Sequence, residues 1–240
     1  RAAEAVQRSR VRNGEGDRDG RRKMLARDLH DQEVGVAVLR SGWDSRPIRV
    51  LVQYREAVPH LEIAVGDRLL VDGPWRVGVA TAAGPLAVEG PWTLSCWESD
   101  RRATFLEITA PLAGGLQIDR QVVLLPRDRV VILSAAVTHR PAETPRQGGA
   151  GSLKIESVLP LAASLEGEQA EETREVFVCD TKPRFMALPL SLPEWKAAGR
   201  GRFEVGADGL VVEQQAAATR CCVPVWIDLD PRRQGRPLTW

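Results

Sequence analysis

The fold class is decided by residues 116–137, which read LQIDRQVVLL, then PRD at 126–128, then RVVILSAAV. Two apolar runs of strand length on either side of a short polar link predict a long antiparallel β-hairpin. Apolar residues also occupy every second position of Ile48–Tyr54 and Leu61–Val65, which places one face of each strand in a core and the other in water.

The same pattern recurs along most of the chain and predicts ten further strands. They are Val34–Leu39, Leu69–Val71, Trp75–Ala80, Trp92–Glu98, Thr104–Ala110, Leu153–Leu159, Glu175–Val178, Arg184–Leu188, Gly209–Gln214 and Cys221–Leu229. In no segment of helix length do apolar residues recur with a period of 3.6, although the acidic stretch Glu166–Arg174 is compatible with one or two helical turns. We therefore predict an all-β fold, a large two-sheet antiparallel β-sandwich or super-sandwich.

The beginning of the chain differs from the rest. It is rich in charged residues and contains NGEGDRDG, a composition typical of a flexible loop. We interpret residues 1–30 as a flexible or partly helical leader or linker, and residues 31–240 as the β-sandwich domain. Residues 140–151 are expected to form a surface loop. Because the chain starts without methionine and stops in the apolar stretch Pro237–Trp240, we expect a domain truncated at both ends of a longer protein.

Charge and composition exclude several classes of partner. Lys and Arg total 33 and Asp and Glu total 32, which gives a formal net charge of +1 over 240 residues. No global field therefore directs the chain to nucleic acid or to an anionic membrane, and no apolar run has the length of a membrane span. We assign no compartment from the sequence. Export would place the protein in the periplasm or outside the cell.

Motifs that carry metals, cofactors or nucleophiles are missing from the sequence. The four cysteines include no CxxC pair, and the phosphate-binding loop, the nucleophile elbow and HExxH do not occur. Cys221 and Cys222 are adjacent, which is poor geometry for a bridge between them, whereas Cys96 and Cys179 could form one disulfide in an exported protein. The three histidines are far apart, so we predict no metal site and no cofactor.

Tryptophan is unusually frequent, with seven residues against a single tyrosine. Trp75, Trp92 and Trp97 cluster around predicted turns. Aromatic rings of this kind stack on sugar faces, so these three are candidates for a glycan-binding platform. Core packing is the alternative, because tryptophan buries a large area and needs only one hydrogen-bond partner.

Tyr54 and His60 are the one tyrosine–histidine pair that is close in sequence. Both side-chain types can transfer protons. Tyr54 continues the apolar face of its strand, which favours burial in the core. His60 opens a strand directly after a proline, which favours exposure, so it is the better candidate for a functional role.

One part of the chain resembles a known family. Residues 59–73, PHLEIAVGDRLLVDG, resemble the β-sandwich domain of heparinase II/III-like polysaccharide lyases, in which a histidine-containing segment leads into a strand, a small turn and a Leu-Leu-x-Asp-Gly-like ending. Residues 36–43, VAVLRSGW, look like the family's opening strand. Residues 118–133, IDRQVVLLPRDRVVIL, are similar to its hairpin. The resemblance covers roughly residues 33–137.

This resemblance implies a sandwich that follows an N-terminal α/α toroid and takes part in β-elimination on uronate-containing glycans. A base removes the proton next to the uronate carboxylate while nearby groups neutralise that carboxylate. Only His60 matches a family position, where it would bind or neutralise the carboxylate with help from Arg55 or Arg68. The family's second histidine and its aspartate are missing here, so we expect the chain to be catalytically incomplete by itself.

Two other functions stay open at this point. The domain could be a non-catalytic glycan-binding module that uses Trp75, Trp92 and Trp97, which requires exposed rings on one surface. It could also be a purely structural domain, which requires buried rings and a locally satisfied His60. The partners expected from the resemblance are a polysaccharide and a toroid domain of the same protein, with no nucleic acid and no membrane.

Overall fold

A computed structural model describes residues 26–139, 152–199, 201–217 and 220–234. Almost all of the predicted leader, the predicted surface loop at 140–151 and the apolar end at 237–240 lie outside the described residues. No helix among the described residues is long and apolar enough to cross a membrane.

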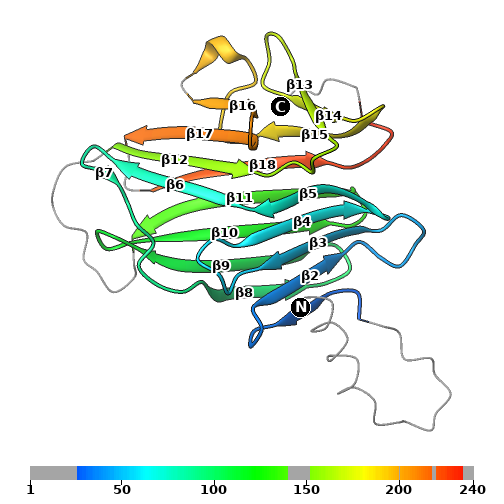
Figure 1. The fold of residues 1–240 in the computed structure, drawn as a ribbon, viewed down its shortest axis with the longest axis horizontal. Helices are drawn as coiled ribbons and strands as arrows, with labels where there is room; N and C mark the ends of the chain where they lie inside the picture. The colour runs from blue at the N-terminus through cyan, green and yellow to red at the C-terminus, as the bar shows by residue number, and fades with distance from the viewer. Residues whose placement is uncertain (1–25, 140–151, 200, 218–219, 235–240) are drawn as a thin grey trace, which may run out of the picture.

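The described chain forms three antiparallel sheets (Figure 1). Sheet A runs in sequence order through β1 Leu29–Asp31, β2 Val36–Arg40, β3 Ile48–Gln53, β4 His60–Val65 and β5 Arg68–Pro74. Sheet B has the order β16 Arg202–Gly206, β17 Gly209–Ala217, β12 Ser152–Leu159, β6 Arg76–Thr81 and β7 Gly84–Pro85. Sheet C has the order β13 Glu166–Gln169, β14 Val176–Cys179, β15 Pro183–Pro189, β18 Cys221–Asp228, β11 Val130–His139, β10 Leu116–Leu125, β9 Thr104–Leu112 and β8 Thr93–Ser99.

Sheets A and B lie side by side and together face sheet C (Figure 1). An antiparallel bridge joins Val71 to Leu161, and the Asp72 amide donates to the Pro160 carbonyl at 3.1 Å. One continuous core contains residues from all three sheets, including the fully buried Val52, Leu106 and Ile155. The predicted all-β sandwich is confirmed, with one of its two layers divided into two sheets.

The hairpin that decided the fold class forms as predicted. β10 and β11 pair without a break from Leu116 opposite His139 to Leu125 opposite Val130. The one or two helical turns considered possible in Glu166–Arg174 do not form, because Glu166–Gln169 forms strand β13 at the edge of sheet C. The one helix in the described residues is a single 3-10 turn at Lys196–Ala198.

All four cysteines are free thiols, so the possible Cys96–Cys179 disulfide does not form. Cys96 lies on β8 at one edge of sheet C, and Cys179 lies on β14 next to the other edge. Five strands separate them, which at about 4.8 Å per strand places the two backbones roughly 29 Å apart. A disulfide requires Cα atoms within about 7 Å.

Candidate functional site

His60 is placed on the outer face of sheet A by the alternation of β4. Leu61 and Ile63 of the same strand are fully buried, so His60 and Glu62 point the other way. In the β4–β5 hairpin Glu62 lies opposite Asp72. The strand register therefore gathers one imidazole and two carboxylates on the same face.

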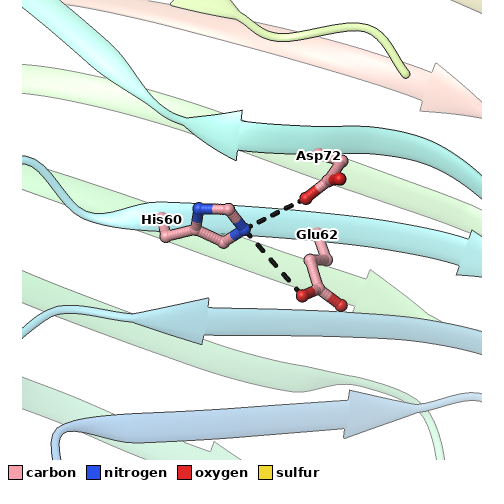
Figure 2. Close-up of side chains that lie close together, drawn as sticks. All are labelled: His60, Glu62 and Asp72. Carbon is pink, nitrogen blue, oxygen red and sulfur yellow. Dashed lines mark hydrogen bonds and ion pairs between the residues drawn. The ribbon is translucent and has the colours of Figure 1, made fainter. Parts of the chain in front are cut away.

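These three side chains contact one another (Figure 2). His60 Nε2 lies 3.1 Å from Asp72 Oδ1 and 3.8 Å from Glu62 Oε1, and the His60 side chain is 35% exposed. Arg49 approaches Glu62 from β3 at 4.0 Å. Both carboxylates approach the imidazole at Nε2, and the shorter contact, with Asp72, fixes the orientation of the ring. A ligand that binds the ring in addition to these two carboxylates would therefore contact Nδ1.

The ligand atoms of His60, Glu62 and Asp72 all lie within 4.8 Å of one another, which is close enough for one metal ion. Imidazole and carboxylate are ordinary ligands of divalent metals. The same arrangement on an exposed sheet face is also an ordinary set of surface ion pairs. Sequence reasoning missed this cluster, although period two along β4 and the hairpin turn together were a signal for it.

The two arginines predicted to assist His60 do not join it. Arg55 donates from its guanidinium to the carbonyls of Gln32 and Glu33, with a distance of 3.1 Å to Gln32. Arg68 forms an ion pair with Asp180 at the opposite end of the β4–β5 hairpin. The predicted set of His60 and two assisting cations is therefore not assembled at one place in the fold.

Trp75 and Trp92 are core residues, so their rings offer no face to a glycan. They are 1% and 5% exposed. Trp75 Nε1 donates to Ser157 Oγ at 2.9 Å, and Trp92 Nε1 donates to the Ala57 carbonyl at 3.0 Å. Arg120 lies over both rings, and burial lowers the pKa of its guanidinium to about 9. Both rings belong to the main core and pack there against this cation.

Trp97 differs from these two, because its ring is only partly buried. It lines a shallow open groove of about 400 Å³ together with both charged and polar side chains. These neighbours are Arg27, Asp28, Ser99, Asp100 and Arg101. Among the three predicted platform residues, Trp97 is the one that the fold leaves accessible to a ligand.

Tyr54 pairs with His30 and not with His60. Its hydroxyl lies 2.8 Å from His30 Nε2, and the two rings are stacked with centroids 6.2 Å apart. His30 also stacks on Trp97 at 5.3 Å. Burial raises the pKa of Tyr54 and lowers the pKa of His30, so both groups favour their neutral forms. The sequence did not predict the His30–Tyr54 pair, because the two residues are 24 positions apart.

Two strongly exposed tryptophans lie outside the predicted set. Trp43, in the β2–β3 loop, is 52% exposed, and the Arg40 guanidinium lies 4.8 Å from its ring centroid. Trp195, before the 3-10 turn, is 51% exposed. Both stand next to irregular segments, where sequence periodicity carries no information about exposure.

No family model and no curated protein matches the chain. Several solved structures are similar to the chain. The heparan sulfate lyase HepC from Pedobacter heparinus matches with a TM-score of 0.63 and 12% identity, over 94% of this chain and 41% of that chain. A heparinase III gene product matches at 0.55 and 10%, over 83% and 35%, and another heparinase III at 0.51 and 12%, over 83% and 36%. The chain spans about 40% or less of each of these proteins. At such identities the likeness concerns the fold, and the chain has the fold of a heparinase-like β-sandwich domain.

Proposed function

We propose that this domain acts on or binds an acidic, uronate-containing polysaccharide as the β-sandwich part of a heparinase-like protein. The observation that carries the proposal is the likeness over 94% of the chain to a heparan sulfate lyase. Because the chain spans only 41% of that lyase, a further domain of the same protein, an N-terminal α/α toroid, would supply the remainder of the active site.

The domain by itself is proposed to be catalytically incomplete. β-Elimination needs a base at the proton next to the carboxylate and positive groups at the carboxylate itself. In the described residues His60 is flanked by Glu62 and Asp72, while Arg55 and Arg68 are held elsewhere. His60 would therefore act as a glycan contact through Nδ1, and the neutralising groups would come from the toroid.

A non-catalytic glycan-binding module is the second candidate. The observation that favours it is Trp97, whose partly buried ring lines an open groove with side chains of both charges. Such a surface can combine ring stacking with hydrogen bonds to sugar hydroxyls. In this function Trp97, and not His60, would determine affinity.

Affinity electrophoresis of the whole chain distinguishes these functions. The gels would contain hyaluronan or heparan sulfate as uronate-rich glycans and dextran as the neutral control. We expect retardation by the uronate-rich gels that His60→Ala abolishes and Trp97→Ala leaves unchanged. Retardation by dextran that depends on Trp97 would favour the binding module. Equal mobility in every gel would overturn both proposals for this chain.

A further inference from the structure

A second site lies at the end of the sandwich opposite to His60. A cleft of about 280 Å³ opens where the β2–β3 loop, the β4–β5 turn, the β10–β11 turn, the start of β15 and the segment after β18 meet. These segments lie together at the right-hand ends of the strands in Figure 1. His60 begins β4 and Val65 ends it, so the strand separates the two sites by about 17 Å.

The lining of this cleft is strongly cationic. Five of its side chains are positively charged, and none is acidic. The cationic residues are Arg46, Arg68, Arg129, Lys182 and Arg184. They come from four separate segments of the chain, so the charge is concentrated by the tertiary structure and not by a basic run in the sequence.

One buried carboxylate behind the cleft offsets only part of this charge. Asp180, whose side chain is 10% exposed, binds Arg184 through both oxygens at 2.9 and 2.6 Å and also pairs with Arg68. It accepts a further hydrogen bond from the Lys182 amide at 3.2 Å. Asp180 therefore fixes two guanidinium groups in the wall of the cleft while having little remaining capacity for the other cations.

The remaining three cations have no ion pair within the part of the chain that the structure describes. The Nε atoms of Arg68 and Arg129 are also buried without a hydrogen-bond partner among those residues. Like charges that line one cleft repel one another, and the buried Nε atoms leave the remaining donors of Arg68 and Arg129 to face the cleft. An anion bound in the cleft would relieve the repulsion.

Arg129 stands in an unusual backbone conformation. Its φ is +55°, and it is the one residue other than glycine in the described chain with a positive φ. A non-glycine residue there carries strain that tends to persist at functional sites. Its guanidinium donates to the Arg46 carbonyl at 3.3 Å, which joins two of the segments that form the cleft.

We propose that this cleft is a binding site for a compact oxyanion, either a sulfate or a phosphate group. Guanidinium groups match tetrahedral oxyanions because their planar donors bind two oxygens at once. A volume of about 280 Å³ lies just below the range of about 300–1,000 Å³ for drug-sized ligands, so the cleft fits one charged group and a small attached moiety. The proposal does not depend on the glycan function proposed above.

Titration calorimetry of the whole chain tests this site, with sodium sulfate and sodium phosphate at an ionic strength balanced with sodium chloride. Glucosamine 6-sulfate and glucosamine 6-phosphate form the second pair of probes and show which source of the group the site prefers. We expect at least one of the four to bind saturably at one site. Heats equal to those of sodium chloride in all four titrations, or equally tight binding of glucuronate, would overturn the proposal.

Three variants make the test specific to the cleft. Arg129→Gly removes a lining cation and relieves the positive φ, so we expect the affinity to fall at least tenfold while the melting temperature stays equal or rises. Lys182→Gln, on an exposed side chain, should weaken binding severalfold without a change in folding. Arg127→Gln is the matched control, because it removes one positive charge from the β10–β11 turn that also holds Arg129, at a position outside the cleft. A loss of affinity in Arg127→Gln as large as in Arg129→Gly would show non-specific attraction and contradict a built site.

Discussion

Asp28 is a buried carboxylate that ties the first described residues to both layers of the sandwich. It accepts hydrogen bonds from the Arg40 amide at 2.7 Å, from Thr104 Oγ1 at 2.7 Å and from Ser99, and it pairs with Arg27. Burial by itself would raise the pKa of Asp28. The hydrogen bonds outweigh burial and hold its pKa below the usual value.

The charge on Asp28 should therefore stabilise the fold in a pH-dependent way. A carboxylate whose pKa is lower in the folded state adds stability that is complete above its unfolded pKa of about 4 and is lost as the pH falls through the folded pKa. We expect Asp28→Asn to lower the free energy of unfolding at pH 7 by about 1–3 kcal/mol and to flatten its decline below pH 4. Urea titrations between pH 7 and pH 3 measure both effects. Parallel pH profiles for the variant and the parent chain would contradict the assignment.

Arg120 is a buried cation, and the partners of its guanidinium are neutral: one backbone carbonyl and two indole rings. It is 3% exposed, donates to the Trp75 carbonyl and lies over the rings of Trp75 and Trp92. Because burial of a charge is unfavourable, its volume should contribute more to stability than its charge.

Two substitutions of Arg120 separate volume from charge. Arg120→Met keeps most of the bulk between the rings and should leave the free energy of unfolding within about 1 kcal/mol of the parent value. Arg120→Ala opens a cavity and should lower it by about 2–5 kcal/mol. Chemical denaturation measures both, and equal losses in the two variants would indicate that the guanidinium itself stabilises the core.

At the scale of elements, the β16–β17 turn packs tightly against the end of β12. Gly209 has a φ of +126°, and a Cβ there would collide with the Leu159 carbonyl. Gly84, at the start of β7, has a nearly identical φ of +124° but open space around the position of a Cβ. The two glycines therefore share their backbone conformation and differ in their surroundings.

Alanine at these two positions should have unequal effects. Both changes introduce the same backbone strain of about 1–3 kcal/mol, and Gly209→Ala adds a clash with backbone worth about 1–3 kcal/mol more. We expect the melting temperature of Gly209→Ala to lie clearly below that of Gly84→Ala. Similar melting temperatures would mean that the β16–β17 turn moves away from β12 without cost.

At the scale of the whole molecule, the strand order of sheet C keeps Cys96 and Cys179 apart. We expect four reactive thiols per chain after unfolding in guanidinium without reductant, and the same melting temperature with and without dithiothreitol. Thiol titration and thermal unfolding measure these two quantities. Two thiols in place of four would show a bridge that the separation of β8 and β14 does not allow.

Two apolar runs of strand length on either side of a short polar link predicted β10 and β11 almost residue by residue. Alternation along Ile48–Tyr54 predicted the burial of Tyr54, and the position of His60 after a proline at the start of a strand predicted its partial exposure. The short edge strands β1, β7, β13 and β16 were missed, since strands of two to five residues carry too few positions for a pattern. Asp72, the nearer partner of His60, lies across the β4–β5 hairpin, where strand register and not periodicity decides the contact.

The sequence by itself determined the longer strands, their inward faces, the antiparallel class and the resemblance to a heparinase-like sandwich, because these depend on apolar runs, local alternation and short turns. Only the tertiary structure decided that Trp75 and Trp92 are buried while Trp97 is not, that Tyr54 meets His30, and that five cations from four segments line one cleft. Those outcomes depend on which distant strands become neighbours. Strand order follows from packing over the whole core, which no local pattern encodes.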